Sequence, residues 1–435
     1  MIDQHATDTD LRRRHKNSAI YKLALARVVA SRVVENTVMA TTRMLRTTIQ
    51  RGSTIARLSE STVIISSRRR SIRQHRQQQR WFSWAVHSET GIVSHDEKPR
   101  YQTIIGLEIH AQLDIPTKLF SSAKVATSPL TQAPNTLVYP FDVAVPGTLP
   151  LTSKSAVQAA VLTAAALNCD IPNTSRFERK HYHYADLPFG YQVTQQRWPM
   201  ARNGTLTVTT TTNNKNKSNK KQNNTQTTIQ VGIDRIQLEQ DTGKTTTTTK
   251  TINDGDNGRT TTVTTSLVDF NRAGCALVEI VMNPDIRSAK HAAQTVETLR
   301  QLLRHIGTCN GKMEEGSLRV DLNVSLQPIY DEDDNSKETS IQQPNLNNRV
   351  EVKNLNSLRQ VQQAAEYEAV RQAKLLSESS TLTFQETRTF HVKSGKTVLI
   401  RTKEGEEDYR FMPEPDLPPI VLDDQVRSAY DAIDH

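Results

Sequence analysis

The residues with the clearest potential for chemistry lie in one short stretch, GKMEEGSLRVDLNVS, between Gly311 and Ser325. Arg319, Asp321 and Asn323 are spaced two apart, and residues two apart on a β-strand point to the same face. A strand here would present a guanidinium, a carboxylate and an amide in a row, with Leu and Val facing a core on the other side. Arginine suits phosphate and carboxylates suit Mg²⁺, so this face could hold a metal-bound nucleotide. The alternative is the solvated face of an ordinary surface strand.

Three further short motifs carry groups of the same kind. Glu108 and His110 are two apart in GLEIHAQL, which on a strand gives either half of a divalent-cation site or an ordinary surface pair. Glu279 lies among apolar residues in LVEIV, and because burying an unpaired carboxylate is costly, it needs a cationic partner or a metal ion. The motif LEQDTGK adds Glu239, Asp241 and Lys244. Acidic and basic groups thus recur as a metal–phosphate site would require.

The motif EVKNLNSLR combines a strand with the start of a helix. Glu351 and Lys353 would share one strand face, and Lys353 and Asn354 precede the helix, whose N-terminus favours phosphate. The common glycine-rich phosphate loops and the GxSxG nucleophile motif are absent from the sequence. A nucleotide would therefore bind in a carboxylate-rich cradle built on a sheet.

The elements that must position these groups are predicted as strands interrupted by three helices. Apolar residues three and four apart predict a helix over 288–306, with a glycine directly after it as a stop. Similar patterns predict helices over 153–167, with Ser153 or Ser155 as N-cap, and over 357–376. Strands are expected within 101–115, 231–244, 266–281, 349–353 and 383–401. Because strands and helices do not alternate regularly, we predict an α+β fold with a mostly antiparallel sheet and flanking helices.

Polar low-complexity segments dilute the foldable sequence. Hydrophobic residues make up 36% of the chain, aromatic residues 5%, and the mean hydropathy of −0.57 is low for a globular protein. Runs of Thr, Asn and other polar residues cannot bury a core, so we interpret them as expanded hairpin loops or disordered insertions. They lie near 205–230, 244–265 and 330–348.

The basic character of the chain is confined to its N-terminal segment. Residues 11–80 hold fifteen Arg and two Lys against two Glu, whereas the whole chain has a net charge of +9. Charge therefore gives no argument for a nucleic-acid-binding body. An Arg-, Ser- and Thr-rich, acid-poor segment predicts a mitochondrial presequence over 1–82, cleaved after Phe82, and then a linker over 83–100. The alternative is a basic arm that stays attached and binds RNA.

Cysteine usage and hydropathy limit the remaining classes. The three cysteines lie far apart and form no CxxC pair, so neither a zinc site nor a disulfide framework is expected. This usage fits a reducing compartment such as the mitochondrial matrix. No apolar run reaches membrane-spanning length, so membrane insertion is not expected.

The motifs also follow an order that resembles a known family. Between Tyr101 and Asp423 they are GLEIHAQL, PGTLP, FERKHYHYADLPFGYQVTQ, LEQDTGK, SLVDFNRAG, LVEIV, MEEGSLRVDLNVS, VEVKNLNSLR, QETR and DYRFMPEPDLPP. The chain resembles the B subunits of the tRNA-dependent amidotransferases, in a mitochondrial, fungal-type form. The resemblance implies a catalytic domain over 101–423 whose cradle is similar to the glutamine synthetase fold. It leaves only a stub over 424–435 where the family has helical and tail domains.

The resemblance further implies an activity within a complex. The B subunits of the family use ATP and Mg²⁺ to phosphorylate the side-chain carboxylate of glutamate misattached in Glu-tRNA(Gln). Ammonia derived from glutamine then displaces phosphate and gives Gln-tRNA(Gln). The amidase, which is the A subunit of the complex, supplies the ammonia, and a small third subunit of C or F type bridges the two. The main alternative is a catalytically impaired scaffold subunit or fragment of the same complex, and a further one is a freestanding ligase acting on a small acid.

Finally, the resemblance assigns roles to individual residues. It places Mg²⁺ on Glu108, His110, Glu239 and Glu279. It makes four residues catalytic, namely Glu108, His110, Arg319 and Asp321. It gives nucleotide and phosphate binding to Asn323, Lys353, Asn354 and Lys244. The family commonly has a second Glu after Glu239, where this chain has Gln240, a neutral amide that could join the site with weaker affinity for Mg²⁺. The zinc-binding cysteine pairs of some family members are missing, so no zinc is expected.

Overall fold

The computed structural model describes residues 84–95, 98–126, 131–214, 223–254, 259–329, 349–378, 385–402 and 409–422. The chain divides into two units, of which Trp81–Val421 contains the elements described below. The predicted presequence, the insertion 330–348 and the stub 424–435 lie outside the described residues.

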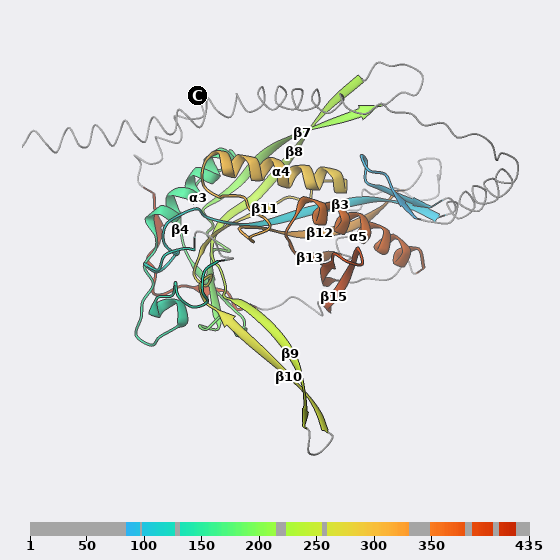
Figure 1. Cartoon of the computed structure of the whole chain (residues 1–435). Coiled ribbons are helices and arrows are strands. Elements are labelled where there is room, and N and C mark those ends of the chain that lie inside the picture. The colour runs from blue at the N-terminus through green and yellow to red at the C-terminus, as the bar shows by residue number, and fades with distance from the viewer. Residues whose placement is uncertain are drawn as a thin grey trace, which may run out of the picture. The chain divides into compact units, whose positions relative to one another are not determined.

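One large sheet forms the centre of this unit (Figure 1). Its main path runs through β15 (Lys396–Thr402), β14 (Glu386–His391), β13 (Val350–Leu355), β12 (Leu318–Ile329), β3 (Lys98–Gln112), β11 (Ala276–Met282), β8 (Asn223–Gln240) and β7 (Ala201–Asn214). Neighbouring strands on this path are antiparallel except β13 and β14, which are parallel. The prediction of mixed α and β structure around a mostly antiparallel sheet is confirmed.

The three helices of the described region lie where the sequence predicts them. They are α3 (Lys154–Ala166), α4 (Ala289–His305) and α5 (Leu358–Glu378). The hydroxyl groups of Ser153 and Ser288 accept hydrogen bonds from backbone N–H groups in the first turns of α3 and α4. Gly307 follows α4 in the left-handed region, with φ of 72°, which ends the helix. In Figure 1, α4 and α5 lie along the same side of the sheet, and they contact each other.

The contacts of α5 show which face of the sheet is apolar. Ala369 and Ala373 of α5 share one buried cluster with Tyr101 of β3 and Leu326 of β12. Since side chains alternate along a strand, the odd-numbered residues of β3 and the even-numbered residues of β12 face the helices. Leu107 is one of these residues and is fully buried. The charged residues of both strands, which have the other parity, must therefore lie on the opposite face.

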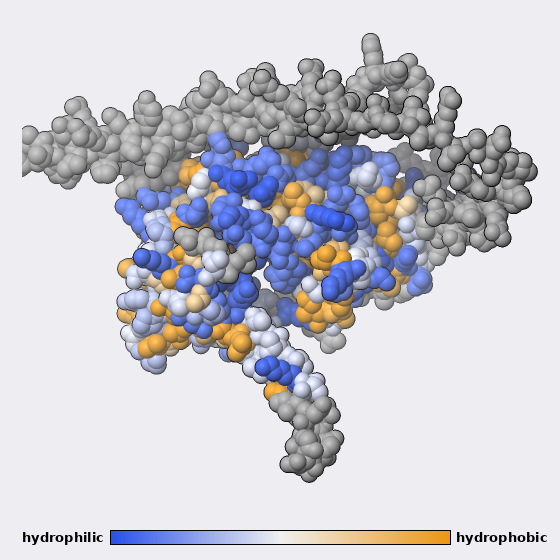
Figure 2. Space-filling view, in the orientation of Figure 1, coloured by the Kyte–Doolittle hydropathy of each residue, from blue (hydrophilic) through white to orange (hydrophobic). Residues whose placement is uncertain are grey.

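Two of the polar segments form long hairpins. The Thr-rich runs continue β7 and β8, and they make up β9 (Lys244–Asp254) and β10 (Arg259–Asp269), which pair in regular antiparallel register. Thr is β-branched and favours extended backbone, so these runs extend strands although they bury no core. The β9–β10 hairpin projects away from the sheet in Figure 1, and its Thr-rich surface is mostly pale in Figure 2. The described parts of both segments thus form paired strands, where loops or disordered insertions were expected.

The segment predicted as a linker, 83–100, contains strands. β1 (Ala85–Val86) pairs with β2 (Ile92–His95), and β2 pairs with β3, which already begins at Lys98. Val93 is buried in the cluster under α5, and Trp84 packs against it. The linker interpretation is therefore wrong for this part, because these apolar residues add to the core. No helix of the described region is long and apolar enough to cross a membrane.

Two small sheets flank the central one. β16 (Met412–Pro413), β5 (Glu178–His181) and β6 (Tyr191–Thr194) form a three-stranded sheet. β4 (Thr174–Ser175) pairs with β17 (Ile420–Val421). The amide of Gln192 on β6 donates a hydrogen bond to the main-chain oxygen of Gln240 at 2.7 Å, which fixes the three-stranded sheet against the end of β8.

Candidate functional site

Strand register gathers the predicted polar residues on the face of the sheet away from α5. Glu279 of β11 lies opposite His110 of β3, and His110 lies opposite Arg319 of β12. Asp321 is paired with Glu108 in the same register. Residues from three strands that are far apart in the sequence thus form one continuous polar surface, and the predicted row of Arg, Asp and Asn on β12 faces the predicted Glu and His on β3.

A first group of ligand atoms consists of His110, Glu239 and Glu279. One nitrogen or oxygen atom of each lies within 4.8 Å of the others, so the three could hold one metal ion. His110 Nδ1 is 3.6 Å from Glu239 Oε1. Gln237 Nε2 donates to Glu279 Oε2 at 2.6 Å, and Thr194 Oγ1 donates to Glu239 Oε2 at 3.2 Å. These hydrogen bonds orient the two carboxylates before any ligand arrives.

A second group consists of Glu108, Asp321 and Glu351, whose carboxylate oxygens also lie within 4.8 Å of one another. Lys353 bridges two of them, with Nζ 2.9 Å from Asp321 Oδ2 and 2.6 Å from Glu351 Oε1. Asn323 Nδ2 donates to Glu108 Oε1 at 3.1 Å. The lysine offsets the negative charge of this all-carboxylate group.

A β-bulge in β13 positions the lysine. The register between β12 and β13 shifts between Val320 and Leu322, and Asn354 adopts the left-handed region with φ of 59°. The backbone N–H of Asn354 donates to Asp321 Oδ1 at 2.8 Å. The extra residue in the bulge re-aims the neighbouring Lys353 toward Asp321. Asn354 therefore acts on the site through its main chain, and its side chain is exposed.

His110 lies between the two groups. Its Nε2 is 3.9 Å from Asp321 Oδ2, while its Nδ1 faces Glu239. Burial lowers the pKa of His110, but the charges of Glu279, Glu239 and Asp321 raise it by more, so its pKa lies above the usual value. The imidazole therefore tends to be charged and to link the carboxylates on either side.

The carboxyl groups themselves repel one another. Burial and then the charge of Glu279 raise the pKa of Glu239 to about 7. Burial also acts on Glu279, but His110, Lys180 and a hydrogen bond with Glu239 hold the pKa of Glu279 below its usual value. The pair therefore keeps one proton up to about neutral pH. Burial and the nearby carboxylates likewise raise the pKa of Glu108. A bound divalent cation would remove this repulsion.

Arg319 is held by the carboxylate of the LEQDTGK motif to which no role was assigned from the sequence. Its Nη2 is 3.1 Å from Oδ1 of Asp241, a buried residue that follows β8. Arg272 Nε is 3.6 Å from the other oxygen, Oδ2, which is buried and makes no hydrogen bond within the described part of the chain. Asp241 thus holds two guanidinium groups at the border of the first group.

The structure changes three of the residue assignments. The four residues expected to bind Mg²⁺ are spread over both groups, because His110, Glu239 and Glu279 form the first and Glu108 belongs to the second. Gln240 follows Glu239 in a regular part of β8, so its side chain points to the opposite face of the sheet and does not join the site. Lys244 lies at the base of the β9–β10 hairpin, exposed and opposite Asp269, and no hydrogen bond or ion pair among the described residues connects it to either group.

Three further residues of the site received no role from the sequence. Glu351 shares its strand face with Lys353, as expected, but its place in a ligand group depends on β13 pairing with β12. Thr194 and Gln237 carry no charge, and although Thr194 lies in the FERKHYHYADLPFGYQVTQ motif, only their contacts with Glu239 and Glu279 reveal their place in the site.

The donor sets of the two groups fit a divalent cation. Three carboxylates suit Mg²⁺, and the group with His110 suits Mg²⁺ less strongly, since imidazole favours transition metals. The shared proton of Glu239 and Glu279 indicates a place where positive charge is missing.

Comparison with known proteins identifies the family. The GatB/GatE catalytic domain matches residues 103–428, and the chain belongs to this family. It is 42% identical to the B subunit of the mitochondrial glutamyl-tRNA(Gln) amidotransferase of Danio rerio, over 79% of this chain and 55% of the relative. It is 44% identical to the corresponding mitochondrial protein of Homo sapiens, over 75% of this chain and 52% of the relative. It is 43% identical to the B subunit of the aspartyl/glutamyl-tRNA(Asn/Gln) amidotransferase of Ehrlichia chaffeensis, over 75% of this chain and 58% of the relative.

Two points follow from these matches. The chain spans little more than half the length of these relatives. Two of the relatives are named as mitochondrial proteins, which supports the mitochondrial location predicted from the N-terminal segment.

The shared proton predicts how Mg²⁺ and pH affect stability. Because the pKa of Glu239 is higher in the folded than in the unfolded chain, this group makes the folded state less stable as pH rises from about 4.5 to about 7. Mg²⁺ bound to the folded state should oppose this loss. We expect millimolar Mg²⁺ to raise the melting temperature more at about pH 8 than at about pH 5, measured by thermal unfolding.

Two variants make this test specific. Glu239→Gln should abolish most of the Mg²⁺ effect, whereas Glu297→Gln, which removes a carboxylate on α4 that pairs with Arg300, should leave it intact. An equal Mg²⁺ effect in both variants would show that the first group holds no cation.

Proposed function

We propose that this protein is a subunit of a tRNA-dependent amidotransferase that converts Glu-tRNA(Gln) into Gln-tRNA(Gln) in the mitochondrial matrix and so supports mitochondrial translation. The observation that carries the proposal is the pair of carboxylate groups on either side of His110, on one sheet face, in a chain of the GatB/GatE catalytic domain family. The names of the relatives support the substrate. Because one relative is also named for Asp-tRNA(Asn), that substrate belongs in the same test.

The proposed reaction activates a carboxylate. A carboxylate is a poor acyl donor, and transfer of a phosphoryl group from ATP to the glutamyl side chain gives it a good leaving group that ammonia can displace. Mg²⁺, held by the two groups of carboxylates, would supply positive charge to the phosphoryl oxygens. Lys353 and Arg319 border the same surface and add fixed positive charge near it. Asp241 and Asp321 hold these two cations in place.

We also propose the finer features implied by the resemblance. The sheet would be a cradle of the glutamine synthetase type, with ATP and Mg²⁺ on its polar face. The amidase, as the A subunit of the complex, would release ammonia from glutamine, and a small third subunit would join the two proteins. The basic segment 1–82 would direct the chain to mitochondria and be removed there.

Reconstitution tests the proposal. The chain, expressed with an amidase partner and a small bridging protein, should convert Glu-tRNA(Gln) to Gln-tRNA(Gln) with glutamine, ATP and Mg²⁺. The measurement separates the glutamyl and glutaminyl esters of the terminal adenosine after nuclease digestion. It should also release phosphate from ATP only when Glu-tRNA(Gln) is present. A complex that assembles and binds tRNA but neither converts it nor releases phosphate would favour the scaffold alternative. Phosphate release without any tRNA would favour the freestanding ligase.

A further inference from the structure

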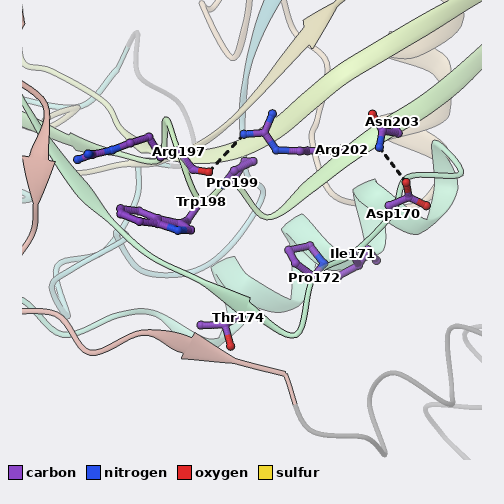
Figure 3. A pocket seen from close by; sticks show the side chains of 9 residues that line it. All are labelled: Asp170, Ile171, Pro172, Thr174, Arg197, Trp198, Pro199, Arg202 and Asn203. Atoms are coloured by element: carbon purple, nitrogen blue, oxygen red, sulfur yellow. Dashed lines mark hydrogen bonds between the residues drawn. The ribbon is translucent and has the colours of Figure 1, made fainter.

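A second site candidate lies away from the two carboxylate groups, in an open hollow between β4 and β7. The hollow has a volume of about 270 Å³ and includes Trp198, Arg197, Arg202, Pro172 and Pro199 among its lining residues (Figure 3). A complete cofactor needs a larger cavity of roughly 300–1,000 Å³. The volume of the hollow is therefore enough for one flat chemical group about as large as a nucleotide base.

The walls of the hollow are fixed by the main chain. Asp170 and Arg202 exchange two backbone hydrogen bonds of 2.8 and 2.9 Å. The carbonyl oxygen of Trp198 accepts from Ser175 Oγ at 2.7 Å and from the backbone N–H of Arg176 at 3.2 Å. The indole side chain takes no part in these hydrogen bonds, and Trp198 as a residue is 36% exposed. A large aromatic ring is thus presented to solvent at little cost in ordering.

Guanidinium groups surround the ring. The Cζ atoms of Arg197 and Arg176 lie 4.9 and 5.7 Å from the centre of the Trp198 ring. Arg197 is paired with Glu178, which is fully buried beneath it. Arg202 donates from Nη2 to the carbonyl oxygen of Arg197 at 3.3 Å and makes no ion pair within the described part of the chain. Its charge is therefore available to an anion.

The carboxylate among the lining residues does not cancel this charge. Asp170 Oδ2 accepts a hydrogen bond from Asn203 Nδ2 at 3.0 Å, as Figure 3 shows, and it forms no ion pair with Arg202 in the described residues. An exposed indole beside an unpaired guanidinium matches the two parts of a nucleotide, a flat base and a phosphate.

The hollow is connected to the carboxylate groups through one short segment. Thr194, which donates to Glu239, lies four residues before Trp198. Gln195, between them, donates to Ser175 Oγ at 2.6 Å and accepts from the backbone N–H of Leu238 at 2.9 Å. A ligand held by Trp198 would thus be anchored on the same segment that orients Glu239.

We infer that this hollow binds one unpaired nucleotide of an RNA, with its base against Trp198 and a phosphate on Arg202. This inference rests on the proposed function for the identity of the RNA, which would be the tRNA substrate. A proline-rich peptide is the other ligand that Trp and Pro side chains can accept, but it gives no role to the unpaired guanidinium.

Fluorescence anisotropy with the full chain tests the inference, with a labelled single-stranded RNA tetranucleotide as the probe. Trp198→Ala should weaken binding about tenfold, which corresponds to about 1.4 kcal/mol and lies within the usual range for stacking on an aromatic ring. Trp198→Phe should retain most of the affinity. Arg202→Gln should weaken binding and make the slope of log K against log salt less negative by about 0.7.

Controls separate the hollow from the basic N-terminal segment, which all variants share. Arg304→Gln removes an exposed arginine from α4 and should leave the affinity of the chain for the tetranucleotide unchanged. The same four nucleotides paired within the stem of an RNA hairpin should bind equally to the wild type and to Trp198→Ala. Equal binding of the single strand to these two proteins would overturn the inference. Competition by a proline-rich peptide as strong as by the tetranucleotide would also overturn it.

Failure of the nucleotide site can be distinguished from failure of the proposed reaction. A complex that forms no Gln-tRNA(Gln) but still loses tetranucleotide binding in Trp198→Ala would refute the proposed reaction alone. A complex that forms Gln-tRNA(Gln) while tetranucleotide binding is unaffected by Trp198→Ala would refute the nucleotide site alone.

Discussion

Glu108→Gln is expected to reduce the formation of Gln-tRNA(Gln) by the reconstituted complex by roughly a thousandfold. Glu108 lies opposite Asp321 in the sheet and accepts a hydrogen bond from Asn323, and it completes the all-carboxylate group. Glutamine keeps the size of the side chain but removes a charge that a cation requires. Losing several kcal/mol of charge stabilisation in phosphoryl transfer corresponds to about three powers of ten in rate.

The measurement is the rate of conversion under single-turnover conditions, with the glutaminase activity of the partner followed in parallel. Glutaminase activity and assembly of the complex should persist in Glu108→Gln, because Glu108 lies on the polar face and supports no core contact of α5. Glu297→Gln on α4 should behave like the wild type. Full conversion by Glu108→Gln would remove the second group from the proposed site.

The second large effect concerns stability. Lys118 is fully buried, and its Nζ lies 2.9 Å from Asp142 Oδ2 in η1 (Pro140–Val143). Asp142 also accepts from Ser121 Oγ and from the backbone N–H of Tyr139, both at 2.9 Å. Lys118→Met leaves this buried carboxylate without a cation, which should lower the free energy of unfolding by about 3–5 kcal/mol.

Urea unfolding measures this loss as a lower midpoint with an unchanged slope. Lys290→Met breaks a more exposed pair with Glu89 and should cost less than about 1 kcal/mol. Lys118→Met combined with Asp142→Asn should recover part of the loss, because the uncompensated charge is then gone. A loss in Lys118→Met no larger than in Lys290→Met would contradict the role of the buried pair.

Local pattern was sufficient for the three helices and for the strands that carry the site residues. The helix over 288–306 followed from apolar spacing and a terminal glycine, and α4 has nearly these limits. Alternation in the Leu318–Ser325 stretch separated a core side from a charged side, as β12 shows. The segment 83–100 was mistaken for a linker because its strands are too short to give a clear period.

Local pattern was not sufficient for the site. The sequence determined which residues share a strand face and which family the chain resembles, because alternation and motif order act within or along the chain. Only the tertiary structure decided that Glu108 joins Asp321 and Glu351, that Arg319 is held by Asp241, and that Lys244 stands apart. The physical reason is register: β3 and β12 pair across a wide separation in sequence, and core packing of whole strands, not the site residues themselves, fixes which side chains meet.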